Sequence, residues 1–301
     1  MHQNDLDDRH DRGLQYDLAT LYRRRRVLQL FGGVALAAMV GCSNDDDNGD
    51  GATSTVAPEL TATATAAGTT ATRVATAAST LVAPIPVSPT PLSACTRIPA
   101  ETAGPFPGDG SNGPNALAQS GIVRSDLRAS FGASTKVSAG APLEVELTVV
   151  DTKNACRPLA GAALYLWHVD AEGRYSMYSA GATAENYLRG VQVADANGVV
   201  RFTTVFPGAY TGRWPHIHFE VYPSLDAATS SANKLATSQL ALPEDVCRQV
   251  YSGSGYPGSL ANLAQTPLAR DTVFADGVTL QMATVSGSLN AGYRASLVVG
   301  I

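Results

Sequence analysis

The sequence predicts an all-β domain: a β-sandwich core of short antiparallel or mixed strands, with long loops and little helix. Three observations lead to this prediction. Several short segments show the apolar–polar alternation or the short apolar runs of strands, and turn residues separate them. Hydrophobic residues make up 45% of the chain, which is enough for a sizeable core. Charged residues make up only 16%, which is too few for a disordered or coiled-coil protein.

The first predicted strands lie in the middle of the chain. The run 143–149 alternates between apolar and polar residues, as a half-buried strand does. The run 162–168 is short and apolar. The runs 188–194 and 199–205 flank Asn197-Gly198, and Asn-Gly between two such runs is a strong hairpin signal. We therefore expect these last two strands to pair with each other.

The C-terminal third continues the same pattern. Strands are predicted at 216–222, 278–285 and 293–299, where apolar residues recur with strand spacing. One short helix is expected at 244–251, because it follows Pro243 and proline is tolerated at the start of a helix. Together these segments predict a folded domain over residues 94–301.

The first 42 residues have the composition of an export signal. Arginines at 23–26 precede an apolar run at 27–40, which is too short to span a bilayer comfortably. Residues 24–29 resemble a twin-arginine signal, and residues 39–42 resemble a bacterial lipobox, with Cys42 as the residue that becomes lipidated. The alternative is an uncleaved anchor helix. Either interpretation places the remaining chain outside the cytoplasm, and the first places it at the cell envelope, periplasmic or on the outer face.

Residues 43–93 are rich in Thr, Ala, Pro and Ser and contain no aromatic residue. Such a segment buries too little surface to offset the entropy of ordering it, so we interpret it as a disordered tether between the signal at 1–42 and the folded domain. The net charge of −5 argues against a nucleic-acid partner, which would require a basic surface.

The chemistry of the domain centres on two histidines. His216 and His218 are two residues apart in a predicted strand, so both imidazoles lie on one face, where they could share a cation as neutral ligands. Two tyrosines accompany them in the sequence: Tyr210, six residues upstream of His216, and Tyr175, in the segment Gly173-Arg174-Tyr175-Ser176. A phenol becomes a good ligand only for a strongly charged cation, so a His/Tyr set favours Fe(III) over zinc or copper. Taken singly, each of these residues is also an ordinary strand histidine or core tyrosine.

Four segments, in order, resemble the intradiol ring-cleaving dioxygenases, the non-haem Fe(III) family that includes catechol and protocatechuate dioxygenases. These segments are 99–106 (PAETAGPF), 159–176 (with LWHVDAEGRYS), 188–198 (LRGVQ and DANG) and 206–218 (FPGAYTGRWPHIH). The resemblance covers about residues 95–240.

The resemblance implies roles for particular residues. Its iron ligands are Tyr175, Tyr210, His216 and His218. Tyr210 is implied to leave the metal when substrate binds. Arg213 is implied to stabilise negative charge on the bound catecholate ring. Gln239 is implied to lie just behind the ligands.

The implied reaction is the insertion of both atoms of O₂ between the two hydroxyl-bearing carbons of a catecholic substrate, which gives a muconate-type diacid in aromatic compound catabolism. The cofactor is non-haem Fe(III), and contact with a membrane is expected only through the lipid anchor. Two departures from the family pattern, Ala103 in place of Glu and Val169 in place of Cys, concern substrate contacts more than the metal.

A second hypothesis from another class is a non-catalytic, membrane-tethered β-sandwich module that binds carbohydrate or iron. The joint presence of Tyr175, Tyr210, Arg213 and the two histidines argues against it, because a binding module does not need all five. Three cysteines lie in the folded domain, at Cys95, Cys156 and Cys247. One pair could form a disulfide outside the cytoplasm, and the sequence leaves all three pairings open.

Overall fold

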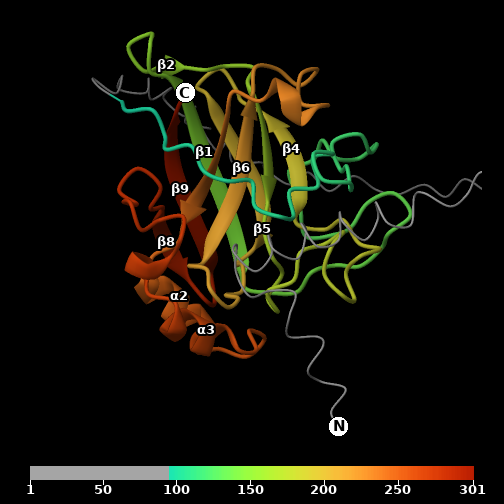
Figure 1. Ribbon diagram of the computed structural model, residues 1–301, viewed down its shortest axis with the longest axis vertical. Helices are drawn as coiled ribbons and strands as arrows, with labels where there is room; N and C mark the ends of the chain where they lie inside the picture. Colours follow the sequence, from blue (N-terminus) through green and yellow to red (C-terminus); the bar gives the residue numbers. More distant parts are fainter. Residues whose placement is uncertain (1–94) are drawn as a thin grey trace, which may run out of the picture. The chain divides into compact units, whose positions relative to one another are not determined.

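The computed structural model describes residues 95–301, and two β-sheets dominate this part of the chain (Figure 1). The first sheet contains β1 (Pro142–Asp151), β2 (Arg157–Pro158), β5 (Val199–Val205), β8 (Thr284–Ser288) and β9 (Gly292–Gly300). Its order is β2–β1–β9–β8, and β5 also pairs with β1. The β1–β9 pair is parallel, and the other pairs of this sheet are antiparallel. The sheet is therefore mixed, as the sequence predicts.

The second sheet has the order β4–β3–β6–β7 and is antiparallel throughout. Its strands are β4 (Arg189–Val193), β3 (Ala163–Trp167), β6 (His216–Tyr222) and β7 (Ala236–Ala241). Every residue of β3 and β6 is buried. Burial on both faces means that this sheet has a second layer over it in addition to the first sheet.

The main core lies between the two sheets. On β1, the alternate residues Leu143, Val145, Leu147 and Val149 point into it and are at most 2% exposed. Ile217, Phe219 and Val221 of β6 belong to the same apolar cluster. Each fully buried side chain of this size contributes about 1.5–3 kcal/mol relative to an exposed one. The prediction of a β-sandwich is therefore confirmed.

A smaller apolar cluster covers the outer face of the second sheet. It includes Tyr165 and Trp167 of β3 and Tyr175 from the loop that follows. Residues 99–107 lie over the same face: the Glu101 N–H donates to the Thr237 carbonyl oxygen (2.9 Å), and the Tyr165 hydroxyl donates to the Pro107 carbonyl oxygen (2.7 Å). This N-terminal segment therefore encloses the outer face of β6, where its histidines lie.

Two short helices follow β7 and lie together at one end of the sheets (Figure 1). Helix α2 (Glu244–Tyr251) begins after Pro243, as predicted, and two acidic residues in its first turn suit the positive end of the helix dipole. Helix α3 (Ser259–Gln265) was not predicted. Strand β7 was not predicted either. The part of the chain that the structure describes contains no helix long and apolar enough to cross a membrane.

The predicted hairpin at Asn197-Gly198 is wrong. The turn itself forms, since the Gly198 N–H donates to the Asp195 carbonyl oxygen (2.9 Å), but β4 pairs with β3 and β5 pairs with β1. The turn therefore passes the chain from one sheet to the other. Gly198 is required there, because its φ is +75° and a Cβ would come within 2.3 Å of the Val149 carbonyl oxygen.

The strand predicted at 278–285 is wrong over its first half. Residues 278–282 form a turn in which the Gln281 and Met282 N–H groups donate to the Val278 carbonyl oxygen (2.9 and 2.8 Å). Strand β8 begins only at Thr284. The segment has apolar residues at strand spacing, but it pairs with β7 only through a single bridge between Met282 and Ala241.

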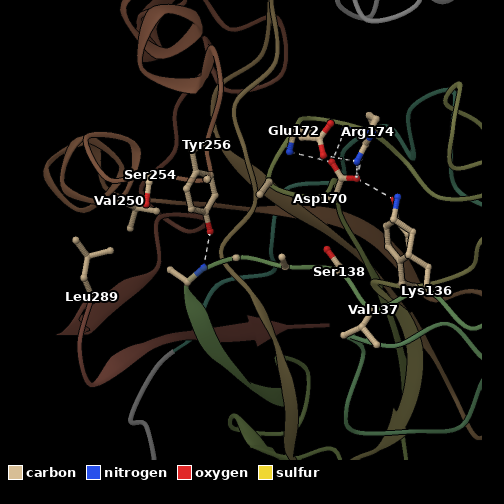
Figure 2. A pocket seen from close by; sticks show the side chains of 16 residues that line it. Lys136, Val137, Ser138, Asp170, Glu172, Arg174, Val250, Ser254, Tyr256 and Leu289 are labelled. Atoms are coloured by element: carbon tan, nitrogen blue, oxygen red, sulfur yellow. Dashed lines mark hydrogen bonds and ion pairs between the residues drawn. The ribbon is translucent and has the colours of Figure 1, made fainter.

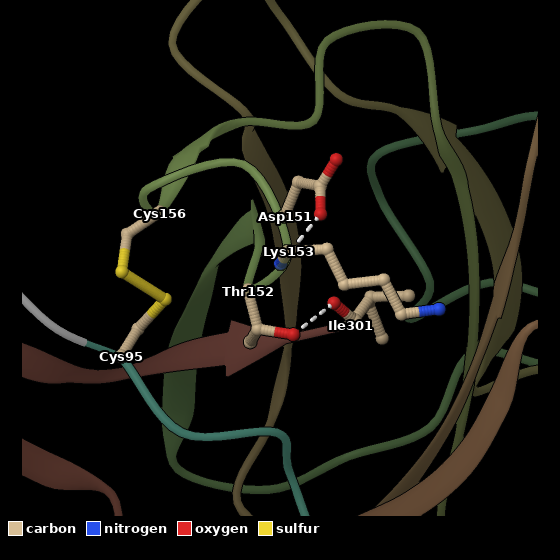
Figure 3. The surroundings of a disulfide bond; sticks show 6 residues. All are labelled: Cys95, Asp151, Thr152, Lys153, Cys156 and Ile301. Atoms are coloured by element: carbon tan, nitrogen blue, oxygen red, sulfur yellow. Dashed lines mark hydrogen bonds between the residues drawn. A yellow bond between two sulfur atoms is a disulfide. The ribbon is translucent and has the colours of Figure 1, made fainter.

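A disulfide joins Cys95 to Cys156, with Cα atoms 5.8 Å apart, and Cys247 is a buried free thiol (Figure 3). This selects one of the three pairings left open by the sequence. The bond ties the start of the described chain to the turn between β1 and β2. The predicted signal at 1–42, with its lipidation site Cys42, and the predicted tether at 43–93 lie outside the described residues.

Candidate active site

Strand β6 presents its two histidines on the outer face of the second sheet. His216 and His218 alternate with Ile217 and Phe219, which point into the main core. His218 pairs with Trp167 on one neighbouring strand and with Gln239 on the other. The Trp167 and His218 rings stack, with centroids 4.9 Å apart and planes 6° apart. Both imidazoles are thus held in fixed positions by the sheet.

Two loops bring the tyrosines to the histidines. Tyr175 lies in the loop between β3 and β4, and Tyr210 lies in the loop between β5 and β6. The Gly208 N–H donates to the Asp170 carbonyl oxygen (3.1 Å), and a Cβ at Gly208 would come within 2.6 Å of the Ala171 carbonyl oxygen. Only glycine allows the two loops to approach this closely, so the loops position both tyrosines as one unit.

Four heteroatoms converge at this site. The Tyr175 hydroxyl oxygen lies 3.1 Å from His218 Nε2 and 3.5 Å from His216 Nε2. The Tyr210 hydroxyl oxygen lies 3.3 Å from the Tyr175 oxygen and 3.4 Å from His216 Nε2. The two Nε2 atoms are 3.1 Å apart. The structure therefore brings together all four residues that the sequence analysis selected as ligands.

Protonation follows from the surroundings of these groups. His216 Nδ1 contacts the Trp214 carbonyl oxygen, which can only accept, so Nδ1 carries the proton and Nε2 presents a lone pair to the site. Burial and, to a lesser extent, the nearby Arg213 lower the pKa of His216 to about 3. Burial, with His216 beside it, also holds the pKa of His218 well below its usual value. Both imidazoles are therefore neutral at pH 7 and can donate an electron pair to a metal.

Burial raises the pKa of the Tyr175 phenol well above its usual value, and the neighbouring Tyr210 adds to this effect. This phenol would therefore lose its proton only to a strongly charged cation. Within residues 95–301 there is no group of three or more His, Cys, Asp or Glu side chains that could hold a metal. A donor set of two neutral imidazoles and two phenols fits Fe(III) better than zinc, which favours thiolates and further imidazoles.

Arg213 is buried beside this donor set. Its Nη1 lies 3.4 Å from His216 Nε2, and its Nη2 donates to Gln239 Oε1 (2.6 Å). Burial alone would lower its pKa, but interactions with Tyr210 and Asp271 more than offset this, and the net pKa is raised. Arg213 is therefore a permanent positive charge next to the converging donors. Gln239 donates in turn to the Thr102 carbonyl oxygen (2.9 Å), which links Arg213 to the N-terminal segment.

Asp271 was missed by the sequence analysis. It is fully buried, and its Oδ2 accepts from Arg213 Nε (3.0 Å) and from the Trp214 N–H (2.6 Å). Its Oδ1 accepts from the Val273 and Phe274 N–H groups (2.8 and 3.0 Å). The positive charge of Arg213 holds the pKa of Asp271 low despite its burial. No motif in the sequence relates Asp271 to Arg213, so nothing local could have identified it.

His168 does not point toward the four donor atoms. Its Nδ1 bonds the Val169 carbonyl oxygen (2.7 Å) and its Nε2 bonds the Thr204 hydroxyl (2.8 Å), so it is a packed residue between β3 and β5. Of the two departures from the family pattern, Val169 is buried and Ala103 packs against the outer apolar cluster. Gly104, the residue after Ala103, lies against the His218 ring.

Comparisons with known proteins agree with this site. The chain matches a family model described as Dioxygenase over residues 113–216, a range that includes Tyr175, Tyr210, Arg213 and His216. No curated protein matches the chain.

Solved structures give a second comparison. The chain is similar to an intradiol ring-cleavage dioxygenase from Tetranychus urticae, with 25% identity and a TM-score of 0.54 over 69% of this chain and 95% of that one. A second dioxygenase structure gives 25% identity and a TM-score of 0.54 over 69% and 94% of the two chains. The family model and these structures, together with the fold, show that this chain belongs to the intradiol ring-cleavage dioxygenases, which are oxidoreductases.

Proposed function

We propose that this protein is an exported, Fe(III)-dependent enzyme that cleaves a catecholic ring between its two hydroxyl-bearing carbons, inserts both atoms of O₂ and releases a muconate-type diacid. The observation that carries this proposal is the convergence of the Tyr175, Tyr210, His216 and His218 donor atoms, of which five of the six pairs lie 3.1–3.5 Å apart. Membership of the dioxygenase family favours this enzyme over a tethered binding module.

Tyr175, Tyr210, His216 and His218 are the residues that would hold the iron. When bound, Fe(III) supplies the Lewis acidity and redox chemistry that make a catecholate reactive toward O₂. The two histidines and Tyr175 are almost fully buried, whereas Tyr210 is only partly buried. This difference supports Tyr175 as the ligand that stays. It supports Tyr210 as the one that moves aside, with its hydroxyl oxygen taking up a proton from the substrate.

Arg213 supports the proposal through its charge. A catechol that gives up both hydroxyl protons carries negative charge on its ring, and a buried guanidinium next to the donor set stabilises that charge without reorganising. Asp271 and Gln239 fix the guanidinium on two sides, which leaves Nη1 directed at the site. Aromatic side chains pack around the donors: the Trp167 ring stacks on His218, and the Phe274 ring lies 6.5 Å from His216.

The visible absorption spectrum tests the proposal. The purified protein, analysed for iron and titrated with catechol under nitrogen, is expected to show a tyrosinate-to-Fe(III) charge-transfer band that shifts on binding. Admission of O₂ is then expected to convert catechol to a diacid with the uptake of one O₂ per ring. A protein that stays colourless after reconstitution with Fe(III) would contradict the ligand assignment. A coloured protein that binds catechol without turnover would support the iron site and contradict the enzyme.

Export and lipid anchoring are a separate part of the proposal, supported by the twin-arginine-like residues 24–29 and the lipobox-like residues 39–42. Cys42→Ser is expected to move the protein from the membrane fraction to the soluble fraction of the producing cell. Cys247→Ser is the matched control, because that cysteine is a buried thiol in the folded domain. Retention of the C42S variant in the membrane fraction would favour the uncleaved anchor helix.

A further inference from the structure

A cavity lies behind the loop that carries Tyr175, with a volume of about 490 Å³. Asp170, Ala171, Glu172 and Arg174 line it from that loop, but none of the four donor residues lines it. Cavities of this size commonly accept small organic molecules. The cavity is thus separate from the candidate iron site, although both share one loop.

The cavity has two chemically different ends. Figure 2 shows Lys136, Asp170 and Arg174 at one end and Val250 and Leu289 at the other, with Ser138 between them. A ligand that fills it therefore needs a polar group at one end and an apolar body toward the other.

The carboxylate at the polar end is already saturated. Asp170 Oδ1 accepts from the Glu172 and Arg174 N–H groups (both 3.0 Å). Its Oδ2 accepts from Arg174 Nε (3.0 Å) and from the Tyr187 hydroxyl (2.8 Å). A carboxylate with two bonds at each oxygen has little capacity left for a ligand. Asp170 thus shapes the cavity without recognising a cation in it.

Two hydrogen-bond donors of the lining remain unused, Lys136 at the polar end and Ser138 between the two ends. Ser138 is 6% exposed, and its hydroxyl has no hydrogen-bond partner among the described residues. No described carboxylate lies within ion-pair distance of Lys136 Nζ, which lies 5.8 Å from the centre of the Tyr187 ring. A buried hydroxyl without a partner costs free energy, and a ligand that accepts a hydrogen bond would recover it.

We propose that this cavity binds a compact organic carboxylate, with the carboxylate at Lys136 and Ser138 and an apolar body of about one ring toward Val250 and Leu289. The Tyr256 hydroxyl does not compete for it, since it accepts from the Ala141 N–H (2.8 Å) and donates to the Phe206 carbonyl oxygen (2.9 Å). The site requires neither iron nor ring cleavage, so it stands independently of the proposed function.

Benzoate is the probe that tests this site. Equilibrium dialysis of labelled benzoate against the purified full-length protein is expected to give saturable binding of one molecule per chain, with a Kd of about 1 mM or tighter. Lys136→Glu is expected to weaken binding about tenfold or more, because it removes a charge-assisted contact and adds repulsion. Lys153→Glu makes the same charge change at another exposed lysine and is expected to leave the Kd unchanged.

Ser138→Ala provides a second variant that preserves charge and is expected to weaken binding several-fold, by about the worth of one hydrogen bond. Thermal melting of each variant confirms that it is folded. Absence of saturable benzoate binding would overturn the proposal. So would an equal Kd for the K136E and K153E variants.

The location of the probe is tested by competition. Saturating catechol under nitrogen is expected to leave benzoate binding intact, because none of the four residues of the candidate iron site lines this cavity. Benzylamine, which carries a cation in place of the carboxylate, is expected not to displace benzoate. Displacement by catechol would place benzoate at the candidate iron site and overturn the proposal, and displacement by benzylamine would overturn the assignment of an anion site.

Discussion

Tyr175 and Tyr178 are three residues apart in one loop, yet their hydroxyl groups have different surroundings. The Tyr175 hydroxyl faces Tyr210, His216 and His218, whereas the Tyr178 hydroxyl accepts from the Gly108 N–H (2.8 Å) and donates to Asn112 Oδ1 (2.7 Å). The loop therefore contains a candidate metal ligand, Tyr175, and a second tyrosine, Tyr178, whose hydroxyl makes only structural hydrogen bonds and which can serve as its control.

Tyr175→Phe is expected to lower the iron content and to reduce turnover of catechol by about a hundredfold or more, because it removes one of the donors that hold the metal. Tyr178→Phe is expected to retain iron and to cost about 1 kcal/mol of stability through its lost hydrogen bonds. Iron quantitation and steady-state rates check both variants. Equal iron content in the two variants would rule out Tyr175 as a ligand.

Asp271 acts on the site through Arg213. Asp271→Asn leaves the four donors in place but weakens the contact that orients the guanidinium, so the iron content is expected to stay constant while the KM for catechol rises about tenfold. Asp126→Asn, which affects an exposed Asp–Arg pair, is the matched control. Steady-state kinetics and iron analysis check this prediction, which fails if both variants behave like the unmodified protein.

These two cases also show what the sequence could predict at the scale of residues. Tyr175, Tyr210, Arg213 and the two histidines are found in short segments that resemble those of the dioxygenase family, and that resemblance implies their roles. Asp271 reaches Arg213 from 58 positions away, and only the packing of the chain brings them together. A buried partner of this kind leaves no periodic or motif signal.

Strand positions were predicted better than strand partners. The alternation in β1 and the His-Ile-His pattern in β6 fix which residues face the core, because the side-chain period of a strand is two. Asn197-Gly198 fixes only a local turn. Strand β5 pairs instead with β1, in a register that runs from Pro142 opposite Val205 to Thr148 opposite Val199. These two strands are far apart in the sequence, so no local pattern reveals that they pair.

The Cys95–Cys156 disulfide closes a loop with a sequence separation of 61. Its removal is expected to lower the free energy of unfolding by up to about 4 kcal/mol, because the unfolded chain regains conformational entropy. The Cys95→Ser, Cys156→Ser double variant is therefore expected to unfold at lower urea concentration. Dithiothreitol is expected to lower the urea midpoint of the original protein toward that of the double variant and to leave the double variant unchanged. An original protein insensitive to the reductant would contradict the prediction.

At the scale of the whole molecule, the buried histidines set the response to acid. Burial lowers the pKa of His168 to about 4, from an ordinary value near 6.5. Between these two values the unfolded chain binds a proton that the folded chain does not, so stability decreases as the pH falls through this window. His168 alone is expected to lower the free energy of unfolding by about 2 kcal/mol as the pH falls from 7 to 5.

His168→Gln tests this estimate through the slope of stability against pH, because the variant also loses packing at every pH. The metal-free protein is expected to lose stability as the pH falls from 7 to 5, and the H168Q variant is expected to lose about 2 kcal/mol less over that range. Urea unfolding at several pH values measures both slopes. Parallel slopes would show that His168 takes up its proton equally in the folded and unfolded chains.

The disulfide also determines how a mechanical load would enter the domain. A pull applied from the N-terminal side of Cys95 would pass through a covalent bond into the turn between β1 and β2, and from there into β1, which pairs with β2, β5 and β9. Residues 99–107, which cover the histidines of β6, lie beyond that branch point and are shielded from the load. Tension applied from the N-terminal side of Cys95 is therefore expected to leave the cover over the candidate active site in place.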